Sequence, residues 1–146
     1  TNTTMETKDK TAITVETTIK APVEKVWKYW TEPKHITNWC FASDDWHAPR
    51  AENDLKEKGR FSTTMAAKDG SMSFDFGGVY TQVKQHEVIK YTMDDDRKVD
   101  IQFSTKGNET KVVETFEAEN THPVEMQRDG WQAILDNFRK YAESAK

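Results

Sequence analysis

The last stretch of the chain, residues 123–146, constrains the fold most, because it has the pattern of one amphipathic helix of about six turns. Charged side chains occupy one side, and a mainly apolar face recurs at intervals of three and four residues. The residues of this face are Val124, Gln127, Trp131, Ile134, Leu135, Phe138 and Ala142. Such a face must be covered, so we expect the rest of the chain to form a concave surface around it.

The residues before this helix are mostly typical of an antiparallel sheet. Residues 12–20 alternate apolar and polar side chains and are rich in β-branched residues, which predicts a first strand. Residues 22–39 have helical spacing interrupted by Pro33, which predicts two short helices. Five further strands, separated by turn residues, are predicted at 59–67, 72–84, 87–93, 98–105 and 110–118.

Alternation along these five strands predicts which side chains face the helix. The inward set is Phe61, Thr63, Met65, Met72, Phe74, Phe76, Gly78, Tyr80, Ile89, Tyr91, Met93, Val99, Ile101, Phe103, Val112, Glu114 and Phe116. Glu114 faces the interior if Val112 and Phe116 set the phase, but it faces water if Val113 sets it, and both readings remain open. A carboxyl buried there must be paired, protonated or bound to a ligand.

Glycines stand at two places where secondary structure disfavours them. Gly130 costs about 1 kcal/mol relative to alanine inside a helix, which predicts either close approach to another backbone or room for something else. Gly77 and Gly78 predict a bulge or sharp bend that lets the sheet curl.

Residues 40–58 have few periodic apolar positions, so we expect a long loop, where functional groups often gather. Asp44, Asp45 and His47 surround Trp46 in this loop. A histidine near carboxylates can act as a general base or bind a metal. We favour a solvated turn instead, because two aspartates and one histidine make a poor metal site. Cys40 fits a buried, unreactive thiol.

Composition excludes several classes of protein. The 146 residues include 32% charged residues of both signs and carry a net charge of −4, which disfavours nucleic acid as a partner. The single cysteine excludes a disulfide framework. We find no stretch that predicts a membrane span or a signal peptide. We therefore expect a cytoplasmic protein, monomeric or homodimeric, without a cofactor or bound metal.

Four segments, taken together, resemble one family over about residues 11–143. They are Ile-Lys-Ala-Pro-Val-Glu-Lys-Val-Trp from Ile19, Trp-Thr-Glu-Pro from Trp30 with Ile36 and Trp39, Phe-Asp-Phe-Gly-Gly-Val-Tyr from Phe74, and Gly-Trp from Gly130 with Ile134, Leu135, Phe138 and Tyr141. The chain resembles the family named for the activator of heat-shock protein 90 ATPase, within the START and birch-pollen-allergen (SRPBCC) superfamily.

This resemblance and the pattern of elements imply an α+β helix-grip fold. A curved antiparallel sheet of six to seven strands would wrap around the long C-terminal helix, with two short helices after strand one. We expect residues 1–11 to be a flexible lead-in and residues 12–146 to form a single START-like domain.

The resemblance also implies a cavity between the sheet and the long helix, which in relatives holds lipids, sterols, polyketides or other apolar molecules. Candidate lining residues are Trp46, Phe61, Met65, Met72, Phe74, Phe76, Tyr80, Tyr91, Phe103, Phe116, Met126, Gln127, Trp131 and Leu135. Soft apolar side chains with a few polar groups are usual in small-molecule sites. The same residues could instead pack as a solid core, and that alternative stays open.

Three functions remain as hypotheses. We favour binding of a small apolar or aromatic ligand in the cavity. One alternative is a co-chaperone-like interaction protein that acts on a heat-shock chaperone ATPase through its charged outer face. The other is a cyclase- or hydrolase-type enzyme acting on a polyketide-like substrate, for which His47, Tyr80, Tyr91 and Glu114 are the acid–base candidates.

Overall fold

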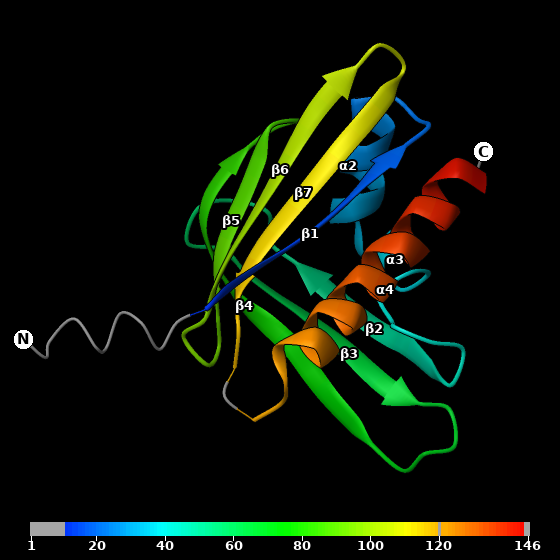
Figure 1. Cartoon of the computed structure of the whole chain (residues 1–146), viewed down its shortest axis with the longest axis vertical. Helices are drawn as coiled ribbons and strands as arrows, with labels where there is room; N and C mark the ends of the chain where they lie inside the picture. The colour runs from blue at the N-terminus through cyan, green and yellow to red at the C-terminus, as the bar shows by residue number, and fades with distance from the viewer. Residues whose placement is uncertain (1–10, 120, 145–146) are drawn as a thin grey trace, which may run out of the picture.

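The chain forms a strongly curved antiparallel sheet that holds a long helix between its two ends (Figure 1). The computed structural model describes residues 11–119 and 121–144. In this part of the chain the sheet has seven strands, in the order β1-β7-β6-β5-β4-β3-β2. Their bounds are β1 Ala12–Ile19, β2 Trp46–Asn53, β3 Arg60–Ala67, β4 Ser73–Lys84, β5 Val88–Met93, β6 Lys98–Lys106 and β7 Glu109–Glu117. The predicted helix-grip fold is confirmed, while the predicted lead-in falls largely outside the described residues.

Two short helices, α2 (Val23–Thr31) and α3 (Pro33–Ile36), follow β1 as predicted. Pro33 separates them, because a proline disfavours the helical conformation in the residue before it. Glu32 is accordingly extended, with φ −86° and ψ 128°. The break turns the chain, so that α3 lies against β2 while α2 packs against β6, β7 and α4.

The long helix α4 spans Val124–Ser144, close to the predicted 123–146. It runs beside β1, and two hydrogen bonds tie the elements together (Figure 1). The Gln132 side-chain amide donates to the Glu16 carbonyl over 3.1 Å, and the Lys20 backbone N–H donates to the Glu143 carboxylate over 2.9 Å. In the part of the chain that the structure describes, no helix is long and apolar enough to cross a membrane.

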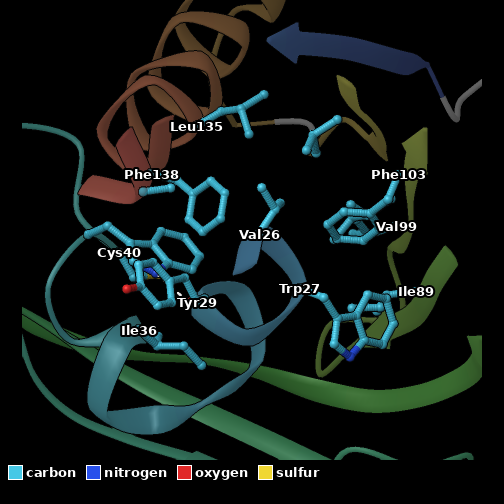
Figure 2. Close-up of a cluster of buried hydrophobic side chains, with 14 of the residues drawn as sticks. Val26, Trp27, Tyr29, Ile36, Cys40, Ile89, Val99, Phe103, Leu135 and Phe138 are labelled. Atoms are coloured by element: carbon cyan, nitrogen blue, oxygen red, sulfur yellow. Dashed lines mark hydrogen bonds between the residues drawn. The ribbon is translucent and has the colours of Figure 1, made fainter. Parts of the chain in front are cut away.

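The predicted face of α4 supplies the centre of the core. Leu135, Phe138 and Ala142 are fully buried, and Figure 2 shows Leu135 and Phe138 directed toward Val26 of α2. The Phe138 ring meets the rings of Trp30 and Trp39 edge-on, at 4.8 Å between centroids in each case. These contacts are the packing that the helical periodicity anticipates.

One stretch predicted as a loop contains a strand. Residues 46–53 form β2, which pairs with β3 and is the edge of the sheet. Its burial pattern is irregular, and its register shifts between His47 and Arg50, with Pro49 between them. A proline is tolerated at a sheet edge because no neighbour needs its missing N–H. The strand was missed because pairing with β3 creates it without an alternating apolar pattern.

The prediction of a bulge at Gly77 and Gly78 was wrong in position. The register shift in β4 lies between Tyr80 and Gln82. A Cβ at Gly77 would lie 2.5 Å from the Phe61 carbonyl oxygen, and one at Gly78 only 2.3 Å from that of Thr92. These glycines therefore let β4 approach its neighbours closely. By contrast, a Cβ at Gly130 would meet open space, so no close backbone approach explains this glycine.

Candidate functional site

A cavity of about 230 Å³ lies between the middle of the sheet, the end of α3 and the first half of α4. Strands β3, β4 and β5 supply most of the sheet wall, and Trp131 and Ile134 of α4 close the other side. Its full lining comprises Trp30, Ile36, Trp39, Cys40, Glu52, Asn53, Phe61, Thr63, Met65, Phe74, Phe76, Tyr80, Ile89, Tyr91, Met93, Arg97, Glu114, Trp131 and Ile134. The exposed residues Glu52 and Phe74 mark its edge.

Strand alternation places this wall. Phe61, Thr63 and Met65 point inward from β3, and Tyr91 and Met93 do so from β5, because side chains two residues apart share a face. The aromatic rings of this wall contact one another across strands. Phe61 approaches Tyr91 edge-on at 4.6 Å between centroids, and it is tilted by 33° against Tyr80 of β4 at 5.1 Å. The wall thus combines aromatic rings in mutual contact with methionine and aliphatic side chains.

Trp131 borders the cavity on the side of α4. Its ring stacks on Phe116 of β7 at 3.9 Å and 9°, and Phe76 of β4 meets it edge-on at 5.9 Å. The stack uses one face of the indole and fixes its orientation. The remainder of the ring borders the cavity.

Glu114 is the one buried carboxyl of the lining. It lies on β7 with Val112 and Phe116, and only 5% of it is exposed, so the inward reading of this strand is correct. Burial raises the pKa of the carboxyl from 4.5 to about 8. In the described part of the chain it makes no hydrogen bond or ion pair. Every polar side-chain atom that is fully enclosed in this part does have a hydrogen-bond partner, so the Glu114 oxygens are not fully enclosed. Its oxygens therefore face the open space of the cavity.

Two further groups lie close enough to interact with Glu114. Burial raises the pKa of the Cys40 thiol to about 12, and the nearby Glu114 carboxyl adds to that shift. Burial also raises the pKa of Tyr91, again with a contribution from Glu114. All three groups are therefore uncharged at neutral pH. Cys40 is an inert part of the wall, because a thiol so rarely ionised is a poor nucleophile.

The second tyrosine of the cavity is already used by the protein. The Tyr80 hydroxyl donates to Asn53 Oδ1 over 2.6 Å, and Asn53 Nδ2 donates to the Thr31 carbonyl over 2.5 Å. Thr31 in turn donates its hydroxyl to the Trp27 carbonyl over 2.8 Å. This chain of hydrogen bonds joins β4, β2 and α2. The Tyr80 hydroxyl proton is therefore already used in a structural hydrogen bond at the cavity.

The structure brings half of the predicted lining residues together. The seven that border the cavity are Phe61, Met65, Phe74, Phe76, Tyr80, Tyr91 and Trp131. The acid–base candidate Glu114 joins them, whereas His47 is exposed on the edge strand β2. His47 and Glu114 therefore do not form a catalytic pair. In the described ranges no three His, Cys, Asp or Glu side chains are placed to share a metal ion.

The other seven predicted residues lie elsewhere. Phe103 and Leu135 pack in the core, and Phe116 supports Trp131 from behind. Met72 and Met126 are exposed, at 62% and 59%. Gln127 is buried but bonds the loop before α4, accepting from the Glu119 N–H and donating to the His122 carbonyl. Trp46 meets Phe74 edge-on at 5.9 Å, outside the lining.

Several lining residues were not predicted. Trp30, Ile36, Trp39 and Cys40 were assigned to the helical corner and its core, yet they also close one side of the cavity. Their aromatic and apolar character was visible, but nothing local distinguishes a core residue from a cavity residue. Asn53 could have been found only through its place on β2, which the sequence did not reveal.

Comparisons with known proteins agree with this architecture. The model of the family described as activator of Hsp90 ATPase homolog 1-like protein matches residues 20–143. No curated protein matches the chain. The solved structure of an AHSA1-like protein from Aeromonas hydrophila is 45% identical, covers 92% of this chain and 94% of its own, and superposes with a TM-score of 0.87.

Two further solved structures extend the comparison. A protein from Cytophaga hutchinsonii is 60% identical over 92% of each chain, with a TM-score of 0.79. A protein from Nitrosomonas europaea is only 18% identical, covering 92% of this chain and 96% of its own, yet reaches a TM-score of 0.80 and so shares the fold. The chain belongs to the family of activator of Hsp90 ATPase homolog 1-like proteins.

Proposed function

We propose that the protein binds a small, mainly apolar molecule in the cavity between β3, β4, β5 and α4. The observation that carries this proposal is an aromatic cavity of about 230 Å³ in which a buried carboxyl has no partner among the described residues. An apolar cavity of about 150 Å³ is large enough to bind benzene. A ligand somewhat larger than benzene therefore suits this volume.

The lining supports binding more directly than catalysis. Most of its side chains are aromatic or aliphatic, and burial of apolar surface stabilises a complex by roughly 25 cal/mol per Å². Catalysis by proton transfer needs an acid and a base within reach of the same substrate atoms. Glu114 and Tyr91 both face the cavity, but no hydrogen bond joins them and His47 lies on the outside.

Native mass spectrometry of the protein as purified from cells, followed by denaturing extraction, tests the proposal. We expect a co-purifying small molecule at near-unit stoichiometry, or saturable binding of naphthalene to the apo protein. Thr63→Phe should fill part of the cavity and weaken binding, whereas the matched variant Thr63→Val leaves the space open and should keep it. Equal, non-saturable naphthalene uptake by both variants, with no co-purifying molecule, would contradict cavity binding.

A second candidate function is contact with an Hsp90-type chaperone, which the description of the family suggests. The observation in its favour is the β3–β4 hairpin, on which Met72 and Phe74 are 62% and 50% exposed. Exposed apolar side chains that lie close together are typical of interaction surfaces. If this role holds, the protein changes the chaperone's ATPase rate and the double variant Met72→Ser, Phe74→Ser does not. An unchanged rate with the unmodified protein would rule it out.

A further inference from the structure

We propose that the cavity takes a ligand with a carbonyl oxygen on a compact aromatic body, and that the Glu114 carboxyl donates a hydrogen bond to that oxygen. This inference rests on the proposed function, because it names the chemical class of molecule that the same cavity binds. It follows from the charge state of Glu114, from the groups around it and from the shape of the wall.

The surroundings of Glu114 supply no cation that is free to pair with it. Arg97 is the one basic residue among the described lining residues, and its Nε donates to Asp95 over 2.8 Å. The titratable groups that interact with the carboxyl, Cys40 and Tyr91, are uncharged at neutral pH. Tyr80 is likewise uncharged, Glu52 at the edge is acidic, and α4 contributes only Trp131 and Ile134. Without a counter-charge the buried carboxyl is held in its protonated form.

A protonated carboxyl is a hydrogen-bond donor, and this one is 95% buried and aimed into an apolar space. The Tyr91 hydroxyl faces the same space from β5. Tyr91 pairs with Val99 and Glu114 pairs with Ile101, two inward positions of the intervening strand β6. A carbonyl oxygen has two lone pairs and donates nothing, so it matches donors that converge from one wall.

The competing ligand class is a cationic amine, which aromatic walls also attract. Its binding would strip water from the ammonium group and ionise a buried carboxyl at the same time, and such desolvation offsets much of the attraction between the charges. A carbonyl compound needs neither step. The two classes have opposite pH dependence, because the ketone binds the protonated carboxyl and the amine binds the ionised one.

Three probes of nearly equal shape separate these possibilities: acetophenone, its hydrocarbon analogue cumene and its amine analogue 1-phenylethylamine. Binding is followed by NMR through the methyl signals of Met65 and Ile134, which border the cavity. At pH 6 we expect acetophenone to bind about tenfold more tightly than cumene, the effect of one net hydrogen bond. Between pH 6 and pH 9 its affinity should fall about tenfold, since the carboxyl ionises near pH 8.

Two variants identify the group responsible. Glu114→Gln keeps a neutral donor and should retain the preference for acetophenone without the pH dependence. Glu114→Met removes the donor at similar volume and should bind acetophenone and cumene equally. Circular dichroism and thermal unfolding confirm that both variants are folded before binding is compared.

The outcomes distinguish failure of this inference from failure of the proposed function. Equal binding of acetophenone and cumene by the unmodified protein leaves cavity binding intact and overturns the carbonyl assignment. Tightest binding of 1-phenylethylamine, strengthening as the pH rises, overturns it in favour of a cationic ligand. If none of the three probes binds, both the proposed function and this inference fail.

Discussion

Two regions on the inner side of the same sheet are filled to different degrees. Beneath α2 and the second half of α4, Phe138 and Val26 are fully buried, and rings pack at 4.8 Å between centroids (Figure 2). Beneath the first half of α4, side chains with the same inward phase border a cavity of about 230 Å³. The first region is covered by two helices and the second mainly by one.

This difference shows that alternation decides which residues face inward but not whether they meet. Phe103 and Tyr91 both point inward, from neighbouring strands β6 and β5. The Phe103 ring meets Trp27 and Trp30 of α2, at 5.2 and 5.9 Å between centroids. Tyr91 has only other sheet rings around it and the cavity beyond. Ring contacts from α2 therefore fill the space inside Phe103, whereas beside Tyr91 the one α2 residue that borders the cavity is Trp30.

The largest test of the comparison is truncation in the filled region. Phe138→Ala removes a fully buried ring that contacts Trp30 and Trp39, so we expect a loss of about 4 kcal/mol in the free energy of unfolding. The matched variant Phe74→Ala, at a half-exposed ring on the cavity edge, should lose much less. Urea denaturation of both measures the contrast. Equal losses would mean that the two regions are packed alike.

For each pH unit, a smaller effect is expected from Glu114. Its pKa is raised from 4.5 to about 8 in the folded protein, so between these values the folded state holds a proton that the unfolded state has lost. The free energy of unfolding should therefore fall as the pH rises through that window, by up to about 1.4 kcal/mol for each pH unit. The reference is Glu114→Gln, which cannot titrate. Parallel stability curves for the two proteins would show that Glu114 is not buried as described.

The smallest effect is expected at Gly130, beside Trp131 on the half of α4 that covers the cavity. A Cβ there meets open space, so Gly130→Ala should stabilise the helix by up to about 1 kcal/mol. The opposite sign is expected for Gly78→Ala, whose Cβ would lie 2.3 Å from the Thr92 carbonyl oxygen. Thermal unfolding compares the two. Destabilisation by Gly130→Ala would contradict the open space around this glycine and would indicate that α4 lies closer to its neighbours.

Much of the fold followed from local pattern. The helical face of residues 123–146, the proline break at Pro33 and six of the seven strands have periodicities or turn residues that the chain carries in itself. Strand β2 has no such alternating pattern, because its strand conformation comes from pairing with β3. The site was harder to predict, because Met126 and Trp131 are both large apolar residues of α4, yet of these two only Trp131 borders the cavity.

By itself, the sequence determined the α+β class and the long covering helix, which depend on spacing along the chain, and it indicated the family through the motifs that resemble it. Tertiary structure alone decided that Glu114 faces inward, that Trp30 and Trp39 border the cavity and that β2 closes the edge of the sheet. The physical reason is that a cavity is the space left between elements. Its volume depends on how α2 and α4 cover the sheet, and no single strand or helix encodes that arrangement.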